Sequence, residues 1–367
     1  MNEKMTEDNA KLQKQVNDHN TKLQKQVDDL SEKMTEDNAK LQKQVDELSE
    51  KMSRMCEMQI EVMMKVTQMM TEVKQLKQMI PGQQLVRKSI IIAGGENKNS
   101  INSVEIFSWE NKTWTLLNPM STCRSRASAV TYQGEVIISA GTDGKKSTDT
   151  METSSCDASV EWKISPVKLS ELCRGHAAIM YKDSLILSGG IASKTSDKIY
   201  KISMVPPYST KILATMPEPR YDHTMELFED KLFIFGGCYE GAKDTVMMYN
   251  LVTKEWKMMT PLPFAVDEMA TVLWQNNVIV LGGRNNFTGC KDTVVMYNLT
   301  TGESKYLPSM KHKRRGCAAV VTGGVLVVMG GEHVKSAEAF HFQEQVWEEL
   351  PDMNEARKYA SAVVKPN

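Results

Sequence analysis

Proline, glycine and aromatic residues are all absent from the first 80 residues, Met1 to Ile80. Proline and glycine are the residues that most often break helices, so this absence excludes the usual turn signals from the segment. The segment is instead dense in Lys, Glu, Gln, Met and Leu, which favour helix. We therefore predict one continuous helix, which Pro81 and Gly82 end; residues 81–84 form the linker to a second domain.

The chain as a whole also lacks several features that define other classes of protein. Its net charge is only −1, which argues against nucleic acid or an anionic membrane surface as a partner. Its longest apolar runs are too short to cross a membrane, and the polar, charged residues Met1–Lys4 argue against a secretory signal. Seven cysteines lie far apart without a Cys-x-x-Cys pair, so neither a disulfide scaffold nor a zinc site is indicated. We expect a cytoplasmic protein with reduced thiols, no metal and no cofactor.

Apolar residues in the N-terminal segment follow a helical period. From Val45 to Ile80 they alternate at steps of three and four residues, a heptad pattern that only Gln59 breaks. The block Glu3–Val16 recurs unchanged as Glu32–Val45, which keeps the apolar stripe on one side of the helix. We predict that residues 1–80 self-associate as a parallel coiled coil, with dimer and trimer both open. A lone solvated helix and a disordered arm are the alternatives.

The rest of the chain is organised by an apolar run that ends in glycine and occurs six times. The second glycine of each run stands at a regular interval, with steps of 46, 49, 47, 46 and 48 residues. These glycines are Gly95, Gly141, Gly190, Gly237, Gly283 and Gly331. A fixed period of this length is typical of propellers and related repeat folds. Each period also holds an alternating strand that ends near an aromatic residue, with a tryptophan seven positions later in three copies: Phe107 and Trp114, Tyr249 and Trp256, Phe340 and Trp347.

Four short strands per period predict one antiparallel sheet, and such sheets bury both faces by stacking radially into a ring. The glycine pairs, the aromatic-to-tryptophan spacing and the Met-x-x-x-Arg turns resemble the kelch repeat. The resemblance implies an all-β six-bladed kelch β-propeller over residues 85–367, preceded by the coiled-coil arm. The region begins with a second strand, so the C-terminal segment Lys358–Val364 is expected to complete the first blade. The second blade departs most from the pattern, because Ala140 replaces a glycine and its aromatic strand, Asp149–Cys156, is degenerate.

Arginine recurs four residues after the turn Met in several copies. In a propeller, equivalent positions surround the axis, so these arginines and their neighbours are expected to converge at one mouth. The candidate partner-binding residues are Arg124, Arg126, Arg174, Arg220, Arg284, Arg314, Arg315 and Arg357. Arginine suits paired hydrogen bonds to carboxylates. In kelch-containing substrate adaptors of cullin ubiquitin ligases this turn helps to hold a peptide, so the resemblance implies a protein or acidic peptide as the partner. The alternative is that the arginines only brace loops or cap strands.

Three functions follow from these observations. The first is a non-enzymatic scaffold or substrate-recognition adaptor, whose partners could include components of a cullin ubiquitin ligase. Most kelch-like adaptors recruit the ligase through a BTB domain, and residues 1–80 hold none. The second is an actin or cytoskeletal cross-linker, since some kelch proteins bind actin. The third, an enzyme, is disfavoured because no catalytic motif stands out; His176 and His223 share one repeat position, and no His-x-x-x-His spacing suggests a metal.

Overall fold

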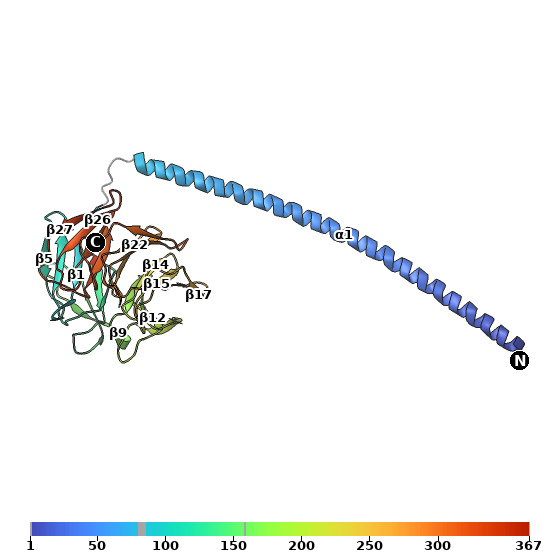
Figure 1. Ribbon diagram of the computed structural model, residues 1–367, viewed down its shortest axis with the longest axis horizontal. Coiled ribbons are helices and arrows are strands. Elements are labelled where there is room, and N and C mark those ends of the chain that lie inside the picture. The colour runs from blue at the N-terminus through green and yellow to red at the C-terminus, as the bar shows by residue number, and fades with distance from the viewer. Residues whose placement is uncertain (1, 80–85, 158, 286, 367) are drawn as a thin grey trace. The chain divides into compact units, whose positions relative to one another are not determined.

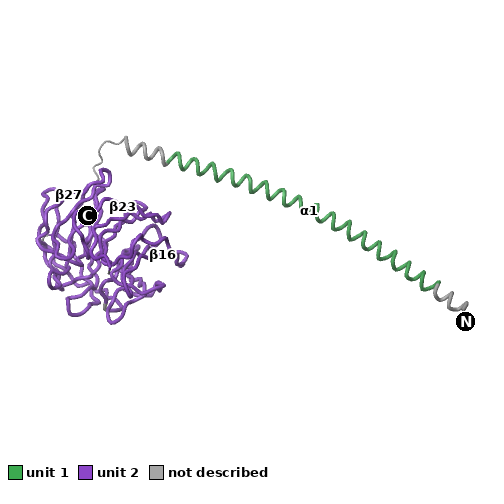
Figure 2. Tube along the Cα trace, in the orientation of Figure 1, with its two compact units in different colours: residues 1–83 green, residues 84–367 purple. Residues whose placement is uncertain are grey.

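The computed structural model describes residues 2–79, 86–157, 159–285 and 287–366. The chain divides into two compact units, Met1–Gln83 and Gln84–Asn367 (Figure 2). The predicted linker, residues 81–84, lies outside the described residues. Each unit is considered by itself below.

The first unit is a single helix, α1 (Asn2–Met79), without interruption (Figure 1). Every side chain described in it, from residue 10 to residue 69, is exposed, including the seam residues Leu41, Leu48 and Val66. The apolar stripe predicted from the heptads is therefore present and uncovered in this single chain. No helix in the described residues combines the length and apolarity that spanning a bilayer requires.

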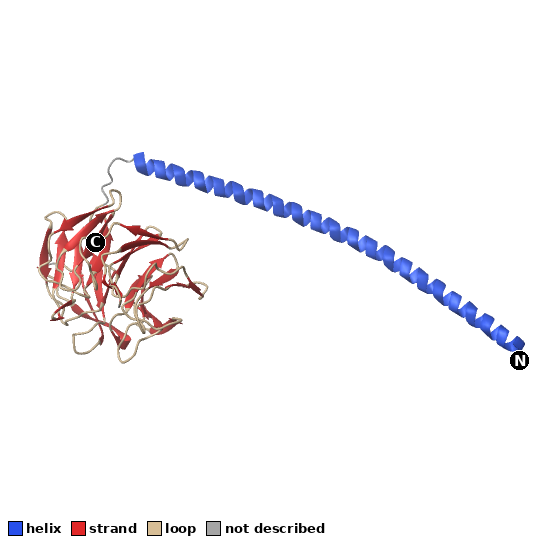
Figure 3. Cartoon of the chain, viewed as in Figure 1, coloured by secondary structure: helices blue, strands red, loops and turns tan. Residues whose placement is uncertain are grey.

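The second unit contains six four-stranded antiparallel sheets (Figure 3). The first blade runs β28 (Ser361–Val364), β1 (Ile90–Ala93), β4 (Val104–Ser108) and β5 (Thr113–Leu117). The second runs β6 (Ser128–Tyr132), β7 (Glu135–Ser139), β8 (Thr148–Ser154) and β9 (Lys163–Cys173). The third runs β10 (Ala177–Tyr181), β11 (Ser184–Ser188), β12 (Lys198–Ser203) and β13 (Thr210–Thr215).

The last three blades repeat this order. The fourth has β14 (Thr224–Phe228), β15 (Lys231–Phe235), β16 (Val246–Asn250) and β17 (Trp256–Met258). The fifth has β18 (Ala270–Trp274), β19 (Asn277–Leu281), β22 (Val294–Asn298) and β23 (Ser304–Leu307). The sixth has β24 (Ala318–Thr322), β25 (Val325–Met329), β26 (Ala337–His341) and β27 (Val346–Leu350). Two small hairpins, β2 (Glu96–Asn97) with β3 (Asn99–Ser100) and β20 (Arg284–Asn285) with β21 (Gly289–Cys290), lie in loops. The six-bladed propeller expected from the sequence is confirmed.

The core lies between neighbouring blades. The second strand of each blade is buried on both faces, which explains why its sequence is a continuous apolar run instead of an alternating one. The aromatic residues seven positions apart face each other across the third and fourth strands. Phe107 pairs with Trp114 in register, with ring centroids 5.1 Å apart. Tyr249 and Trp256 repeat this contact at 4.9 Å.

In five of the six blades a glycine pair ends the second strand, and at its first glycine an added side chain would collide with a neighbouring backbone. Gly94 has φ of 62°, and a Cβ added there would lie 2.3 Å from the carbonyl oxygen of Arg124. Because Gly94 has no side chain, the turn that holds Arg124, after β5, can approach the end of β1 in the same blade. Ala140 adopts the same left-handed conformation, with φ of 52°, so the second blade keeps the turn without the glycine.

Strand β28 closes the ring where the sequence placed it. It pairs with β1 over four residues, from Ile90 opposite Val364 to Ala93 opposite Ser361. The second blade also has all four strands, but the pairing of β8 with β9 shifts register at Thr150. That irregularity corresponds to the degenerate strand of the sequence.

Candidate functional site: the axial ring and its arginines

A closed ring of backbone hydrogen bonds surrounds the propeller axis. Each blade contributes one residue, and the N–H of each donates to the carbonyl oxygen of the residue from the preceding blade at 2.7–3.2 Å. The ring residues, in order, are Arg126, Gly175, Asp222, Glu268, Gly316 and Tyr359. The bond from Arg126 N–H to Tyr359 O, at 3.1 Å, closes the circle.

All six ring residues adopt the left-handed backbone conformation, with φ between 50° and 64°. This conformation is unfavourable for residues other than glycine, and four of the six carry side chains. The surrounding blades thus hold the ring in this conformation, and the ring in turn sets the backbone positions of the four side chains.

Two arginines meet three carboxylates on one side of the ring. Arg126 forms ion pairs with Asp222 and, at 3.6 Å, with Glu268. Arg284 contacts Asp267 at 3.0 Å and Glu268 at 3.2 Å. Burial raises the pKa of Asp267, although the charge of Arg284 acts against that shift. These arginines are therefore already neutralised within the chain.

A second group of charges continues around the ring. Arg315 bonds Glu332, with Nε to Oε2 at 2.6 Å, and Lys358 reaches the same carboxylate at 3.1 Å. The hydrogen bond from Arg315 lowers the pKa of Glu332 to about 2. The guanidinium of Arg126 lies 3.7 Å from the centroid of the Tyr359 ring, a cation–π contact.

Four of the predicted partner-binding arginines are not at a surface. Arg124, Arg220, Arg314 and Arg357 are each 0–1% exposed. Each side chain donates to the carbonyl at the first glycine position of the next blade: Arg124 to Ala140, Arg220 to Gly236, Arg314 to Gly330 and Arg357 to Gly94, at 2.7–2.8 Å. The expectation that these four line an open mouth is wrong, because their guanidinium groups are turned between the blades.

Three of these arginines also pair with a buried glutamate of the blade they enter. Arg124 binds Glu152, Arg314 binds Glu338 and Arg357 binds Glu105, at 2.8–3.0 Å, with all six side chains fully buried. The backbone of each arginine is bonded to one blade and its side chain to the next, as Gly95 N–H to Arg124 O shows. The alternative reading, that the arginines brace the fold, describes these residues.

Sequence reasoning missed the three glutamates. A signal was present, because Glu105 and Glu338 each stand two residues before the aromatic residue of the third strand. Glu152 follows the same register in its sheet, opposite Ile138, as Glu105 does opposite Ile92.

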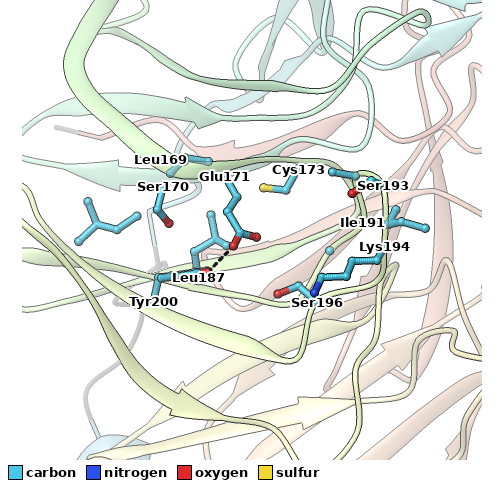
Figure 4. A pocket seen from close by; sticks show the side chains of 14 residues that line it. Leu169, Ser170, Glu171, Cys173, Leu187, Ile191, Ser193, Lys194, Ser196 and Tyr200 are labelled. Carbon is cyan, nitrogen blue, oxygen red and sulfur yellow. Dashed lines mark hydrogen bonds between the residues drawn. The ribbon is translucent and has the colours of Figure 1, made fainter.

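The other two blade interfaces have no arginine. At the fourth-to-fifth interface Val266 takes the position and packs in an apolar cluster with Leu262, Val280 and Val295. At the second-to-third interface Cys173 takes it, and a cavity of about 340 Å³ lies there, lined in part by Cys173, Gly189 and Tyr200 (Figure 4).

Arg174 differs from the other ring-side arginines. It is partly exposed, and among the described residues its side chain donates to the hydroxyl of Ser147, at 3.1 Å, and pairs with no carboxylate. Lys145 and Lys146 are exposed in the same loop as Ser147. Asp143, in the same loop, accepts from the backbone N–H groups of Lys145 and Lys146 and offsets one of these three positive charges. Positive charge therefore remains in excess at the second blade, whereas Arg126, Arg284 and Arg315 are already paired.

Below the ring, the first strands of all six blades line an axial cavity of about 600 Å³. Glu226 is the one carboxylate among its lining residues, and burial raises the pKa of Glu226 to about 7. His176 and His223 also lie there, each bonded through Nε2 to a serine, Ser139 at 3.1 Å and Ser188 at 2.8 Å. Among the described residues no group of three or more His, Cys, Asp or Glu side chains could hold a metal ion.

Comparison with known proteins identifies kelch repeats in both halves of the propeller. The profile described as the KLHDC2/KLHL20/DRC7 Kelch-repeats domain matches residues 175–365, and the Kelch motif matches residues 86–121. The kelch-like protein terF of Aspergillus terreus is 25% identical over 224 residues, which cover 55% of this chain and 49% of that protein. Human kelch repeat and BTB domain-containing protein 3 is 27% identical over 147 residues, covering 35% of this chain and 24% of that protein. The matched regions thus span less than half the length of these relatives.

A solved structure shares the fold. The structure of YjhT superposes with a TM-score of 0.58 at 12% identity, covering 67% of this chain and 88% of that one. At that identity the likeness concerns the fold alone.

Proposed function

Because this chain belongs to the kelch-repeat family, we propose that it is a protein-interaction scaffold whose propeller holds a partner at the ring face. The kelch-repeat relatives favour a protein-binding role of this general kind. The observation that carries the finer proposal is the excess of positive charge at Arg174, Lys145 and Lys146, which Asp143 offsets only in part. A carboxylate-bearing peptide segment suits this group, since Arg174 offers a planar guanidinium with donors still free to bind.

A peptide selection tests this proposal on the full chain. Peptides displayed in random sequence are selected for binding, and we expect enrichment of Asp and Glu in the bound pool. The variant Arg174→Ala/Lys145→Ala/Lys146→Ala is expected to lose that enrichment. Lys257→Ala, which removes an exposed charge on β17, is the matched control. Acidic enrichment that survives the triple change contradicts the proposed site.

We also propose that α1 gathers several chains. Its exposed heptad stripe supports this, because an amphipathic helix of this length buries its apolar face only against a partner. Joined propellers would bind a multivalent partner with higher avidity through effective concentration.

Two finer roles are compatible with such an assembly. One is substrate recognition for a cullin ubiquitin ligase, in which another subunit supplies the contact with the ligase. The other is cross-linking of actin filaments by propellers on a stiff arm. Co-sedimentation of the full chain with filamentous actin separates them, because only the cross-linker pellets with filaments. We place the protein in the reducing cytoplasm, a proposal that seven unpaired cysteines support.

A further inference from the structure

The cavity between the second and third blades occupies the place where other interfaces hold an arginine. Three residues define this position in each repeat. They are the arginine, the first glycine of the pair, whose carbonyl accepts from the arginine, and the third-strand residue that lies beside the guanidinium. Here they are Cys173, Gly189 and Tyr200, and all three line the cavity. Tyr200 stands opposite Leu187 in its sheet, as Glu338 stands opposite Val328 in the sixth blade.

Arg314 shows how an arginine fills the equivalent position at the fifth-to-sixth interface. Its guanidinium donates to Gly330 O at 2.7 Å, to Ser336 O at 2.9 Å and to Glu338 Oε1 at 2.8–3.1 Å. At the second-to-third interface no protein donor reaches the carbonyl of Gly189 among the described residues. The cavity therefore keeps the carbonyl acceptor of Gly189, but the arginine that would donate to it is replaced by Cys173.

At Val266 the surroundings are apolar. The third-strand residue there is Val295, and Val266 packs with it in one cluster of buried apolar side chains. At Cys173 the lining is mixed, with apolar side chains such as Leu187 and Ile202 beside the hydroxyls of Ser170, Ser193 and Ser196. A cavity of this size with several polar groups in its lining can hold water or a polar ligand.

A carboxylate is also present, although it comes from the opposite wall. Glu171, on β9, accepts a hydrogen bond from the hydroxyl of Tyr200 at 3.0 Å (Figure 4). Figure 4 shows Tyr200 toward one side of the lining, Ser193 and Lys194 toward the other, and Glu171 between them. Burial raises the pKa of the Cys173 thiol to about 12, so this side chain adds no charge between them.

We propose that this cavity is a seat for an arginine side chain supplied by a bound protein. The guanidinium would donate to the Gly189 carbonyl, as arginines of this chain do at four interfaces, and to the Glu171 carboxylate, as three of them do to a buried glutamate. Arginine fits better than lysine because its planar group donates in two directions at once. Lys194 is exposed at the rim, where its charge is screened by solvent and free to face an acidic neighbour of the incoming arginine.

The proposal rests on the proposed function, in that the arginine belongs to a protein partner. Its test is independent of the acidic-peptide site, because the probe carries no acidic residue. Acetyl-Gly-Arg-Gly-amide is titrated into the full chain by calorimetry or ligand-observed NMR, with the citrulline peptide, its uncharged analogue, as the matched ligand. We expect the arginine peptide to bind and the citrulline peptide to bind at least tenfold more weakly.

Variants locate the binding. Cys173→Arg restores the internal arginine and is expected to abolish binding of the peptide. Glu171→Gln, which keeps the size of the side chain, is expected to weaken binding about tenfold, which corresponds to about 1.4 kcal/mol. Glu161→Gln removes an exposed carboxylate of the same blade and should leave binding unchanged.

Several outcomes overturn the proposal. Absence of binding to the unmodified chain does so, as do equal binding of the citrulline peptide and unchanged binding to Glu171→Gln. Lys194→Gln tests the opposite charge preference: the proposal expects equal or tighter binding, so a loss there would mean that the cavity prefers an anion. If Cys173→Arg does not fold, Glu171→Gln decides by itself.

Discussion

Buried Arg–Glu pairs link neighbouring blades at three interfaces, and their energetics are those of desolvated charges. Removing both charges from water costs several kcal/mol, which the pair recovers through mutual attraction and additional hydrogen bonds. Glu338 illustrates the second requirement, because its Oε2 also accepts from the N–H of Lys311 at 2.7 Å. Such a pair defines one geometry between the blades more than it adds stability, and breaking it leaves the partner charge buried.

The first prediction follows from that asymmetry. Arg314→Met leaves the Glu338 carboxylate buried without its partner, and we expect it to reduce the free energy of unfolding by about 3–5 kcal/mol. Arg314→Met/Glu338→Met removes both charges and should recover much of the loss. Denaturant unfolding of the full chain, followed by tryptophan fluorescence, measures both.

Arg220 provides the matched control for this pair. It enters the fourth blade at the same position but meets the sulfur of Met247, at 3.6 Å, where the others meet a glutamate. Its carboxylate contact is with Glu218, at 3.5 Å, which is partly exposed and also pairs with Lys243 at 2.8 Å. Arg220→Met therefore strands no buried carboxylate and should cost less than Arg314→Met. If the two single variants lose equal stability, the stranded charge is not the cause.

Glu226 leads to a prediction about pH. Burial in the axial cavity raises the pKa of Glu226 to about 7, above the 4.5 of an ordinary glutamate. The folded state therefore favours the protonated carboxyl, and its contribution to stability is lost as the pH rises from 4.5 through 7. Glu226→Gln should accordingly stabilise the protein relative to the unmodified chain more at pH 8 than at pH 5, as measured by thermal unfolding.

The control for this variant is Glu229→Gln, which alters an exposed carboxyl just beyond the same strand. It should show no such dependence on pH. A Glu226→Gln effect that is the same at both pH values would show that the carboxyl does not titrate in this range.

Residue by residue, the sequence identified which positions repeat but not which way their side chains face. The spacing located Arg124, Arg220, Arg314 and Arg357 correctly as equivalents. Arginine is usually exposed, so their burial could be inferred only together with the glutamates on a neighbouring blade, 24 to 28 residues along the chain or, for Glu105, at its opposite end. Which arginines are neutralised by ring carboxylates likewise depends on contacts between distant blades.

At the scale of elements, local pattern was sufficient for most of the structure. The absence of proline and glycine predicted α1 as one helix, and apolar runs ending in glycine marked the second strand of every blade. The β8–β9 pair is the exception, because β8 is polar and threonine-rich with little alternation, and the register shifts between the two strands could not be predicted from sequence. The long strand β9 also lines the cavity at Cys173, and no local sequence pattern predicted that cavity.

The predicted coiled coil can be tested with two single substitutions in α1. Leu48→Asp places a charge on the heptad seam, so we expect the variant to lose self-association. Lys43→Asp introduces the same residue away from the seam and should keep the assembled mass. Light scattering after size-exclusion chromatography measures the mass of each. If both variants keep the mass of the unmodified chain, residues 1–80 do not join chains through this seam.

At the scale of the whole molecule, two closures hold the propeller as one ring. The first is the pairing of β28 with β1, which joins segments more than 250 residues apart in the chain. The second is the axial circle of hydrogen bonds, in which Tyr359, just before β28, bonds to both neighbours. Removing the C-terminal segment would open both closures together and leave the edge of β1 unpaired.

A circular permutation separates the role of the strand from the role of its position in the chain. The N–H of Lys365 donates to Ser89 O at 2.8 Å, so the end of β28 lies beside the start of β1 and a short turn can join them. Deleting residues 358–367 from the full chain should lower the unfolding temperature strongly, because Ile90–Ala93 and the ring both lose a partner. In the permuted chain, residues 355–366 precede residue 88 through such a turn, and the arm precedes the transferred strand. This arrangement keeps every pairing and should restore most of the unfolding temperature. A deletion variant as stable as the unmodified chain would show that neither closure stabilises the ring.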